Sequence, residues 1–246
     1  MHLLAHPASR LSAKLVPALV VGSLSSFLLA GGAIAQDSTP PATEAGVLGD
    51  AVATDSCDLS NYAATPPGTS VLYSIASDQS EARYLAEEEI AGQGANTAVG
   101  RTNAIIGQIG LDANNAPLTC SRFDVDLRTL ASDDSRRDNK LYDETLETGE
   151  YPLGTFILTS VDGLDGGLVD GQEASVMLLG NLTLHGVTKQ VAWSATVTMS
   201  EGTITGSAET KFNIADFDMV EPTSSLVLSI DDTITLQVDL VAQVAA

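Results

Sequence analysis

Basic side chains are scarce in this chain. Eleven Lys and Arg residues stand against 32 Asp and Glu, which gives the 246 residues a formal net charge of −21 at neutral pH. Nucleic acids and anionic membrane surfaces repel a protein of this charge. A nucleic-acid partner is therefore excluded, and we interpret the acidity as a source of solubility.

Histidine and cysteine are also rare, and this limits the chemistry open to the chain. Of the three histidines, only His185 lies beyond residue 35. No Ser-His-Asp or Cys-His pattern can be assembled around it with confidence, so we expect no catalytic residues and no enzyme. Two cysteines without a neighbouring histidine make a poor metal site. Neither a metal nor a cofactor is expected.

Cys57 and Cys120 are the two cysteines. In an oxidising compartment two cysteines most simply form one disulfide. The bond would close a loop of about 63 residues, for which the chain-entropy model gives roughly 4 kcal/mol. Spacing alone does not show that the two side chains meet, so this pairing is a hypothesis.

The chain lacks an uninterrupted apolar run of the about 18 to 20 residues that a membrane-spanning helix needs. Its nearest candidate is N-terminal, where Arg10 and Lys14 come at the start of an apolar stretch and Ala33-Ile34-Ala35 resembles a cleavage site. These features predict a signal peptide over residues 1–35, cleaved near Ala35, with an uncleaved anchor as the alternative. The remaining chain would carry nine basic and 32 acidic residues, a net charge of −23. We expect it to be secreted, periplasmic or at the cell surface, without an integral membrane segment.

Residues 36–67 are rich in Ser, Thr, Pro and Ala and poor in large apolar side chains. This composition buries too little surface to offset the entropy of ordering, so it predicts a flexible linker. From residue 68 to residue 246 the pattern changes to short alternating segments separated by turn residues. That pattern indicates one all-β domain.

The alternation is clearest at residues 118–127, where Phe123 and Val125 face one way and Arg122 and Asp124 the other. Residues 81–90 are a weaker strand candidate, because three consecutive glutamates leave a helix as the alternative. Residues 132–146 break the β-pattern and predict one short helix with Ser132 as its N-cap. About nine strands and one helix favour a closed barrel or a sandwich.

The segment Gly180-Asn181-Leu182-Thr183-Leu184-His185-Gly186-Val187-Thr188-Lys189 resembles the GxLTxHGVTK signature of the YceI-like family. Four other segments are similar to that family and follow in the same order: residues 123–130, Arg137-Asp138, Tyr151-Pro152 with Phe156, and the corner 215–219. Two departures are Asp218, where a glycine is usual after the phenylalanine, and the strands before residue 90, which match poorly.

The resemblance implies an antiparallel, lipocalin-like β-barrel of about eight to nine strands with one short helix. It also implies an apolar tunnel that holds an isoprenoid-type lipid, such as a quinone or a polyprenyl chain. The alternating strands then offer these inward residues as its lining: Phe123, Val125, Leu127, Phe156, Leu158, Leu178, Leu182, Trp193, Ala195, Val197, Phe212, Leu236 and Val238. A filled core is the alternative at each of these positions, although Ala195, Gly206 and Ala208 are small enough to leave space.

Three other features have a functional and a structural interpretation. His185 is expected to serve the hairpin turn rather than catalysis. Arg136, Arg137 and Asp138 could contact a lipid headgroup, but a helix-surface ion pair is the preferred interpretation. The acidic segment 162–173 could bind calcium through oxygen ligands, but it lacks EF-hand spacing and is expected to be an exposed loop.

The leading hypothesis is a secreted, non-enzymatic protein that carries or stores an isoprenoid-type lipid. The alternative is an acidic cell-surface interaction domain with a filled barrel and no ligand. An enzyme that uses His185 is the weakest hypothesis. The sequence leaves the identity of the lipid open, and it leaves a homodimer open as well.

Overall fold

The computed structural model describes residues 43–58, 60–61, 64–222 and 227–245. The predicted signal peptide and its cleavage site lie outside these residues. Among the described residues, none of the helices combines the length and the apolar character that crossing a membrane would require.

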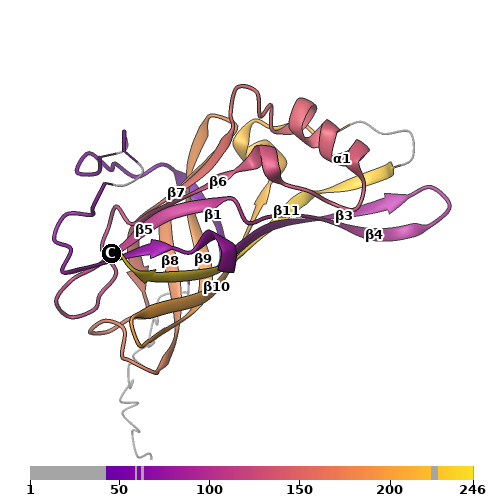
Figure 1. Cartoon of the computed structure of the whole chain (residues 1–246). Helices are drawn as coiled ribbons and strands as arrows, with labels where there is room; N and C mark the ends of the chain where they lie inside the picture. The colour runs from indigo at the N-terminus through magenta and orange to yellow at the C-terminus, as the bar shows by residue number, and fades with distance from the viewer. Residues whose placement is uncertain (1–42, 59, 62–63, 223–226, 246) are drawn as a thin grey trace, which may run out of the picture. The chain divides into compact units, whose positions relative to one another are not determined.

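Eight strands close into an antiparallel barrel (Figure 1). The strands of this ring, in the order in which they pair, are β2 (Val71–Ile75), β5 (Ile105–Leu111), β6 (Arg122–Asp126), β7 (Leu153–Asp162), β8 (Glu173–Leu184), β9 (Val187–Ser200), β10 (Thr203–Asn213) and β11 (Val227–Val244), which returns to β2. The predicted fold class is thereby confirmed. Closure satisfies the backbone groups that an open sheet would leave at its edges.

The strands β3 (Glu81–Ile90) and β4 (Gly94–Thr102) form a hairpin beside the ring. In the long strand β11, the last residues pair with β2 and residues 227–239 pair with β3. Figure 1 shows β3, β4 and the first part of β11 running out together beyond the ring. Residues 81–90 are therefore a strand, and the competing helix is wrong. Alternation turns Glu88 inward and leaves Glu87 and Glu89 exposed.

The helix α1 (Ser135–Lys140) is followed by a π-helical turn over Leu141–Thr145. Its N-cap is Asp134, whose carboxylate accepts the backbone N–H of Arg136, so the predicted cap at Ser132 is wrong. Ser132 instead donates its hydroxyl to Asp138 at 2.6 Å. Both residue types serve as caps, and sequence spacing alone did not distinguish them.

The β8–β9 hairpin turns at His185 and Gly186, which both have positive φ values of 49° and 73°. Two such residues in a two-residue loop suit the twist of an antiparallel pair. The His185 ring packs edge-on against Tyr151 at 4.9 Å, and its Nε2 lies 2.6 Å from a Glu147 carboxylate oxygen. This histidine therefore lies in the turn, as expected, and its ring nitrogens contact neighbouring residues.

Part of the segment predicted as a linker forms a strand, β1 (Gly46–Asp50), which pairs with β9. It pairs with residues 189–192 of β9, next to the stretch of β9 that pairs with β10. The side-chain amide of Asn181 on β8 then holds Val52. It accepts the Val52 N–H at 2.9 Å and donates to the Val52 carbonyl at 2.6 Å. Composition did not predict this strand, because edge pairing depends on backbone groups that any residue supplies.

The disulfide between Cys57 and Cys120 is present, so the predicted pairing is confirmed. It joins the segment that follows β1 to the residues just before β6. Within the barrel, the core contains the buried side chains of Phe156, Leu182, Val191, Trp193 and Phe217.

Candidate functional site

Two apolar cavities follow one another along β8, β10 and β11, the first within the ring and the second beside the β3–β4 hairpin. The first has a volume of about 120 Å³ and the second about 110 Å³. For scale, an engineered apolar cavity of roughly 150 Å³ holds one benzene ring. Each cavity therefore has room for about one five-carbon isoprene unit.

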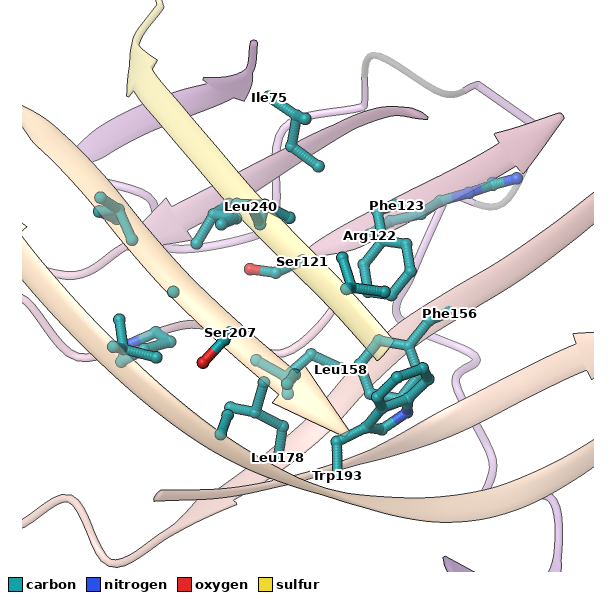
Figure 2. Close-up of a pocket in the computed structure, with 18 of the residues that line it drawn as sticks. Ile75, Ser121, Arg122, Phe123, Phe156, Leu158, Leu178, Trp193, Ser207 and Leu240 are labelled. Carbon is teal, nitrogen blue, oxygen red and sulfur yellow. The ribbon is translucent and has the colours of Figure 1, made fainter. Parts of the chain in front are cut away.

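The first cavity is lined by all eight strands of the ring and by loop residues, and Figure 2 shows a close-up of it. Its lining contains Ile75, Ile109, Leu111, Pro117, Ser121, Arg122, Phe123, Phe156, Leu158, Leu168, Leu178, Trp193, Ala195, Val197, Ile204, Gly206, Ser207, Ala208, Val238 and Leu240. Arg122 extends away from the cavity (Figure 2). Its guanidinium pairs with the buried Asp124 carboxylate at 2.7 Å. The space is thus bounded almost entirely by hydrocarbon.

Three aromatic rings form one wall of the first cavity. The centroids of Phe123 and Phe156 are 5.3 Å apart, and Trp193 meets both rings edge-on at 6.3 and 5.9 Å. Figure 2 shows Phe156 and Trp193 side by side. These distances lie in the range that aromatic pairs prefer.

Small residues on β9 and β10 create the open space opposite this wall. Ala208 pairs with Ala195, and Gly206 pairs with Val197. A Cβ atom added to Gly206 would come within 3.0 Å of the Thr196 carbonyl oxygen. The three small residues noted in the sequence therefore lie together and line the cavity.

The second cavity lies toward the β3–β4 hairpin, α1 and the π-helical turn. Its lining contains Tyr84, Ala86, Glu88, Ala98, Leu127, Leu130, Arg137, Leu141, Thr145, Leu146, Leu184, Phe212, Ile214, Met219, Pro222, Ile230, Ile234 and Leu236. Most of this surface is aliphatic, but four polar side chains contribute to it. Gly100 on β4 is required here, because an added Cβ would lie 2.1 Å from the Tyr84 ring.

A partial dividing layer of buried side chains lies between the two cavities on three strands. On β6, β8 and β10 the residues between the two linings are Val125, Leu182 and Thr210. All three are buried, at 8%, 3% and 0% relative exposure. On β11, by contrast, the successive inward residues Leu236 and Val238 line the second and the first cavity, so the two cavities adjoin along this strand.

The residues predicted to line a tunnel divide accordingly. Phe123, Phe156, Leu158, Leu178, Trp193, Ala195, Val197 and Val238 line the first cavity, and Leu127, Phe212 and Leu236 line the second. Val125 and Leu182 line neither cavity and belong to the dividing layer. Contact of any of these side chains with a ligand stays a prediction.

Of the four polar residues of the second cavity, sequence reasoning singled out Arg137 and missed Tyr84, Glu88 and Thr145. Glu88 is 7% exposed, accepts from Arg137 at 2.8 Å and accepts from Asn96 at 2.7 Å. The signal for Glu88 was available, because it follows Ala82 and Tyr84 at even spacing on one strand face. Thr145 gave no such signal, because its inward position depends on the π-helical turn.

Burial raises the pKa of the Tyr84 phenol to about 12. The positive charge of Arg137 opposes this shift, and the negative charges of Asp138 and Glu88 add to it. The phenol is therefore a neutral hydrogen-bond donor at any physiological pH.

The helix residues considered as headgroup contacts separate into surface and cavity positions. Arg136 is exposed and pairs with Asp134 at 2.7 Å. Arg137 turns inward, and Asp138 is buried and accepts from Ser132. Within the described ranges, no group of three or more His, Cys, Asp and Glu side chains is arranged to hold a metal ion.

A family model described as the YceI-like domain matches residues 73–242. Two curated relatives, both described as UPF0312 proteins, come from Vibrio vulnificus and Shewanella oneidensis. The first is 31% identical over 97 residues, covering 39% of this chain and 48% of the relative. The second is 34% identical over 105 residues, covering 42% of this chain and 50% of the relative. The chain spans about half the length of the curated relatives it matches.

Two solved structures share the fold. One is described as a polyisoprenoid binding domain from Saccharophagus degradans implicated in plant cell wall breakdown, with a TM-score of 0.54 and 18% identity over 71% of this chain and 99% of the other. The second is Burkholderia cenocepacia BcnA, with a TM-score of 0.54 and 16% identity over 69% of this chain and 99% of the other. At these identities the likeness establishes the architecture alone.

Proposed function

This chain belongs to the YceI-like domain family, and we propose that it binds an isoprenoid-type lipid inside its barrel, as a carrier or store. The observation that carries the proposal is a pair of neighbouring apolar cavities, one inside the barrel and one at its end beside the β3–β4 hairpin. The Saccharophagus degradans neighbour, described as a polyisoprenoid binding domain, supports this class of ligand.

The energetics suit an apolar chain without a charged anchor. Burying one isoprene unit is worth roughly 4 kcal/mol, at about 0.8 kcal/mol for each buried carbon. A few units would offset an association cost of about 4 to 15 kcal/mol. One unit fits each cavity as it stands, so a longer chain must displace the dividing layer to occupy both.

The proposal is one of binding and not of catalysis. His185 is held on both ring nitrogens, by Glu147 at 2.6 Å and by the Phe217 carbonyl at 3.3 Å. It serves the β8–β9 turn and lines neither cavity. The Cys57–Cys120 disulfide supports export to an oxidising compartment, where such bonds persist.

Mass spectrometry of organic extracts tests this function, using protein purified from its native host. We expect a long-chain isoprenoid to co-purify with the wild-type protein. In Ala208→Leu a larger side chain would occupy the first cavity, so the amount of bound lipid should fall. Thr205→Leu makes a matched control, because Thr205 is exposed on the same strand.

Extracts without lipid from the wild-type protein would contradict the proposal and favour an acidic interaction domain with a filled barrel. Equal lipid content in Ala208→Leu and Thr205→Leu would place the lipid outside the first cavity.

A further inference from the structure

The strand β4 is the outermost strand of the arm that β3, β4 and the first part of β11 form beyond the ring (Figure 1). Among the described residues, β4 pairs with β3 alone, apart from one bridge between Arg101 and Ala131. In that bridge the two residues exchange both backbone hydrogen bonds, at 2.9 Å each. The backbone N–H and C=O of Arg101 therefore point away from β3.

Three more residues of β4 turn their backbone groups to the same side. In an antiparallel pair the N–H and C=O of one residue point the same way, and this direction alternates along the strand. Ala95, Thr97 and Val99 therefore point outward, as Arg101 does. Within the parts of the chain that the structure describes, their N–H and C=O groups have no backbone partner. This open row has the length of a strand of about five residues.

The open side of β4 lacks the features with which proteins usually block the addition of a strand. Edge strands commonly carry charged side chains, prolines or bulges, because an unprotected edge recruits other chains. Residues 91–100 contain no charged side chain and no proline, although charged residues make up 17% of the chain. The register between β3 and β4 is also unbroken, so no bulge bends this edge away.

The exposed face beside this edge is acidic. Glu87 and Glu89 on β3 are exposed, and they lie opposite Thr97 and Ala95 on β4. Thr97 donates its hydroxyl to the Glu87 carboxylate at 3.0 Å, which draws this charge toward the edge. A strand added beside β4 would lie about 10 Å from β3, at two strand spacings. Long basic side chains on that strand can therefore reach both carboxylates.

A second copy of this chain is a poor occupant of the edge. Each copy carries a net charge of −21, so two copies repel one another. Antiparallel pairing of two β4 edges would also bring Glu87 and Glu89 of both copies to one face. A basic segment is attracted by the same charges, which speed its encounter with the protein.

We propose that β4 is a docking site for an extended, basic segment of a partner protein, which adds a strand along the open side of β4. Its Lys or Arg side chains would lie over Glu87 and Glu89. In this mode of recognition the backbone hydrogen bonds supply affinity and the side chains supply specificity. The docking site is separate from the apolar interior, so it does not depend on lipid binding.

A capped hexapeptide of alternating lysine and valine is the probe for this site. Fluorescence anisotropy of the labelled peptide measures its affinity, and amide hydrogen exchange reports on β4. We expect the peptide to bind, to bind more weakly as the salt concentration rises, and to slow exchange at Thr97.

Two control peptides separate charge from backbone pairing. Glutamate in place of lysine reverses the charge, and this peptide should not bind. N-methylation of the lysines keeps the charge but removes the donors that would face β4. The N-methylated peptide should bind more than about 10-fold more weakly, because it loses several backbone hydrogen bonds.

Thr97→Pro removes an outward N–H without losing a bond to β3, and proline is tolerated at such edge positions. It should weaken binding of the lysine peptide by about 10-fold or more, since the ring also keeps an added strand at a distance. Urea unfolding verifies that the variant is folded. The N-methylated peptide tests the same backbone bonds in the wild-type protein if the variant does not fold.

The double variant Glu87→Gln, Glu89→Gln keeps the open backbone and removes the charge beside it. It should weaken binding of the lysine peptide about 2- to 10-fold and reduce the salt dependence. Glu201→Gln is the matched control, because Glu201 is an exposed acid in the turn between β9 and β10. This control should bind the peptide as the wild-type protein does.

Four results would overturn the proposal. The first is a lysine peptide that does not bind, and the second is equal binding of the lysine and glutamate peptides. The third is an affinity that neither N-methylation nor Thr97→Pro lowers, because strand addition would then be absent. The fourth is a dimer in sedimentation equilibrium that Thr97→Pro abolishes, because a second copy would then be the occupant.

Discussion

Leu182 lies on β8 between the two cavities, with 3% of its surface exposed. It pairs with Lys189 on one side and Phe156 on the other, and its side chain is part of the core cluster. Its side chain lies between the linings of the two cavities on this strand.

Leu182→Ala should join the two cavities. We expect the free energy of unfolding to fall by about 2 to 5 kcal/mol, because a buried leucine leaves a void when truncated. The affinity for a longer isoprenoid should rise relative to a shorter one, because the longer chain no longer has to displace this side chain. Urea unfolding and fluorescence titration measure the two effects.

Ile157→Ala is the matched control for this variant, since Ile157 is buried on the neighbouring strand and lines neither cavity. It should lose stability without any change in chain-length preference. A shift of preference in both variants would mean that general loosening of the barrel, and not the dividing layer, selects chain length.

Strand alternation predicted the inward direction of single residues correctly for Phe123, Trp193 and Phe212. It could not predict which inward residues border empty space, because that depends on how side chains from different strands meet at one level. Val125 and Leu182 follow the same pattern as their neighbours and yet fill the dividing layer. The pairing of Glu88 with Arg137 joins residues 49 positions apart, and no local pattern indicates it.

At the scale of elements, the segment that follows β1 is held by one side chain from β8, the strand on the other side of β9. Asn181 on β8 supplies both a donor and an acceptor to Val52, as the backbone of a paired strand would. Val47 of β1 also packs against the core cluster. The strand is thus fixed by pairing with β9, by one apolar contact and by this amide.

Asn181→Ala should loosen β1 without opening the barrel. We expect faster amide hydrogen exchange across residues 46–52, and a loss of about 1 to 3 kcal/mol in stability from backbone groups left without partners. Hydrogen exchange followed by mass spectrometry measures this. Asn103→Ala removes a bond to the Ser80 carbonyl elsewhere and should leave β1 unchanged. Unchanged exchange in Asn181→Ala would show that pairing with β9 alone holds the strand.

At this scale the sequence did not predict the strand β1 or the N-cap of α1. Composition indicates whether a segment can form a core of its own. It does not indicate whether the backbone of that segment will pair with an unpaired stretch of a strand such as β9. The choice between Ser132 and Asp134 as the cap was settled by the buried Asp138, which draws the Ser132 hydroxyl away.

At the scale of the whole molecule, the disulfide closes a long loop that includes β2, β3, β4 and β5. Four strands of the sheet thus lie between the two cysteines. Cross-linking a loop of this length restricts the unfolded chain by roughly 4 kcal/mol in the entropy model.

The double variant Cys57→Ser, Cys120→Ser should therefore unfold with a free energy about 2 to 5 kcal/mol lower than the oxidised wild-type protein. Urea unfolding with and without a reductant measures the difference. The reductant should destabilise the wild-type protein and have no effect on the variant. Equal stability of oxidised and reduced wild type would show that the linkage does not limit unfolding.

The sequence predicted the architecture of the whole barrel well, because its strands alternate over many residues and family-like segments occur in order. It did not predict the two chambers. An eight-stranded barrel is just wide enough either to be filled or to hold a small ligand, so a few side chains decide the outcome. In this chain the deciding positions include Leu182, Ala208 and Gly206, which has no side chain.

The division of the interior has a kinetic consequence for any ligand that occupies both chambers. Val125, Leu182 and Thr210 must move aside for such a molecule to thread from one chamber into the other. Its residence time would then follow the rate at which the barrel interior rearranges, while a short ligand in one chamber would exchange freely. Two chains with equal equilibrium affinity could thus leave the protein on very different timescales, and the protein would retain the longer one.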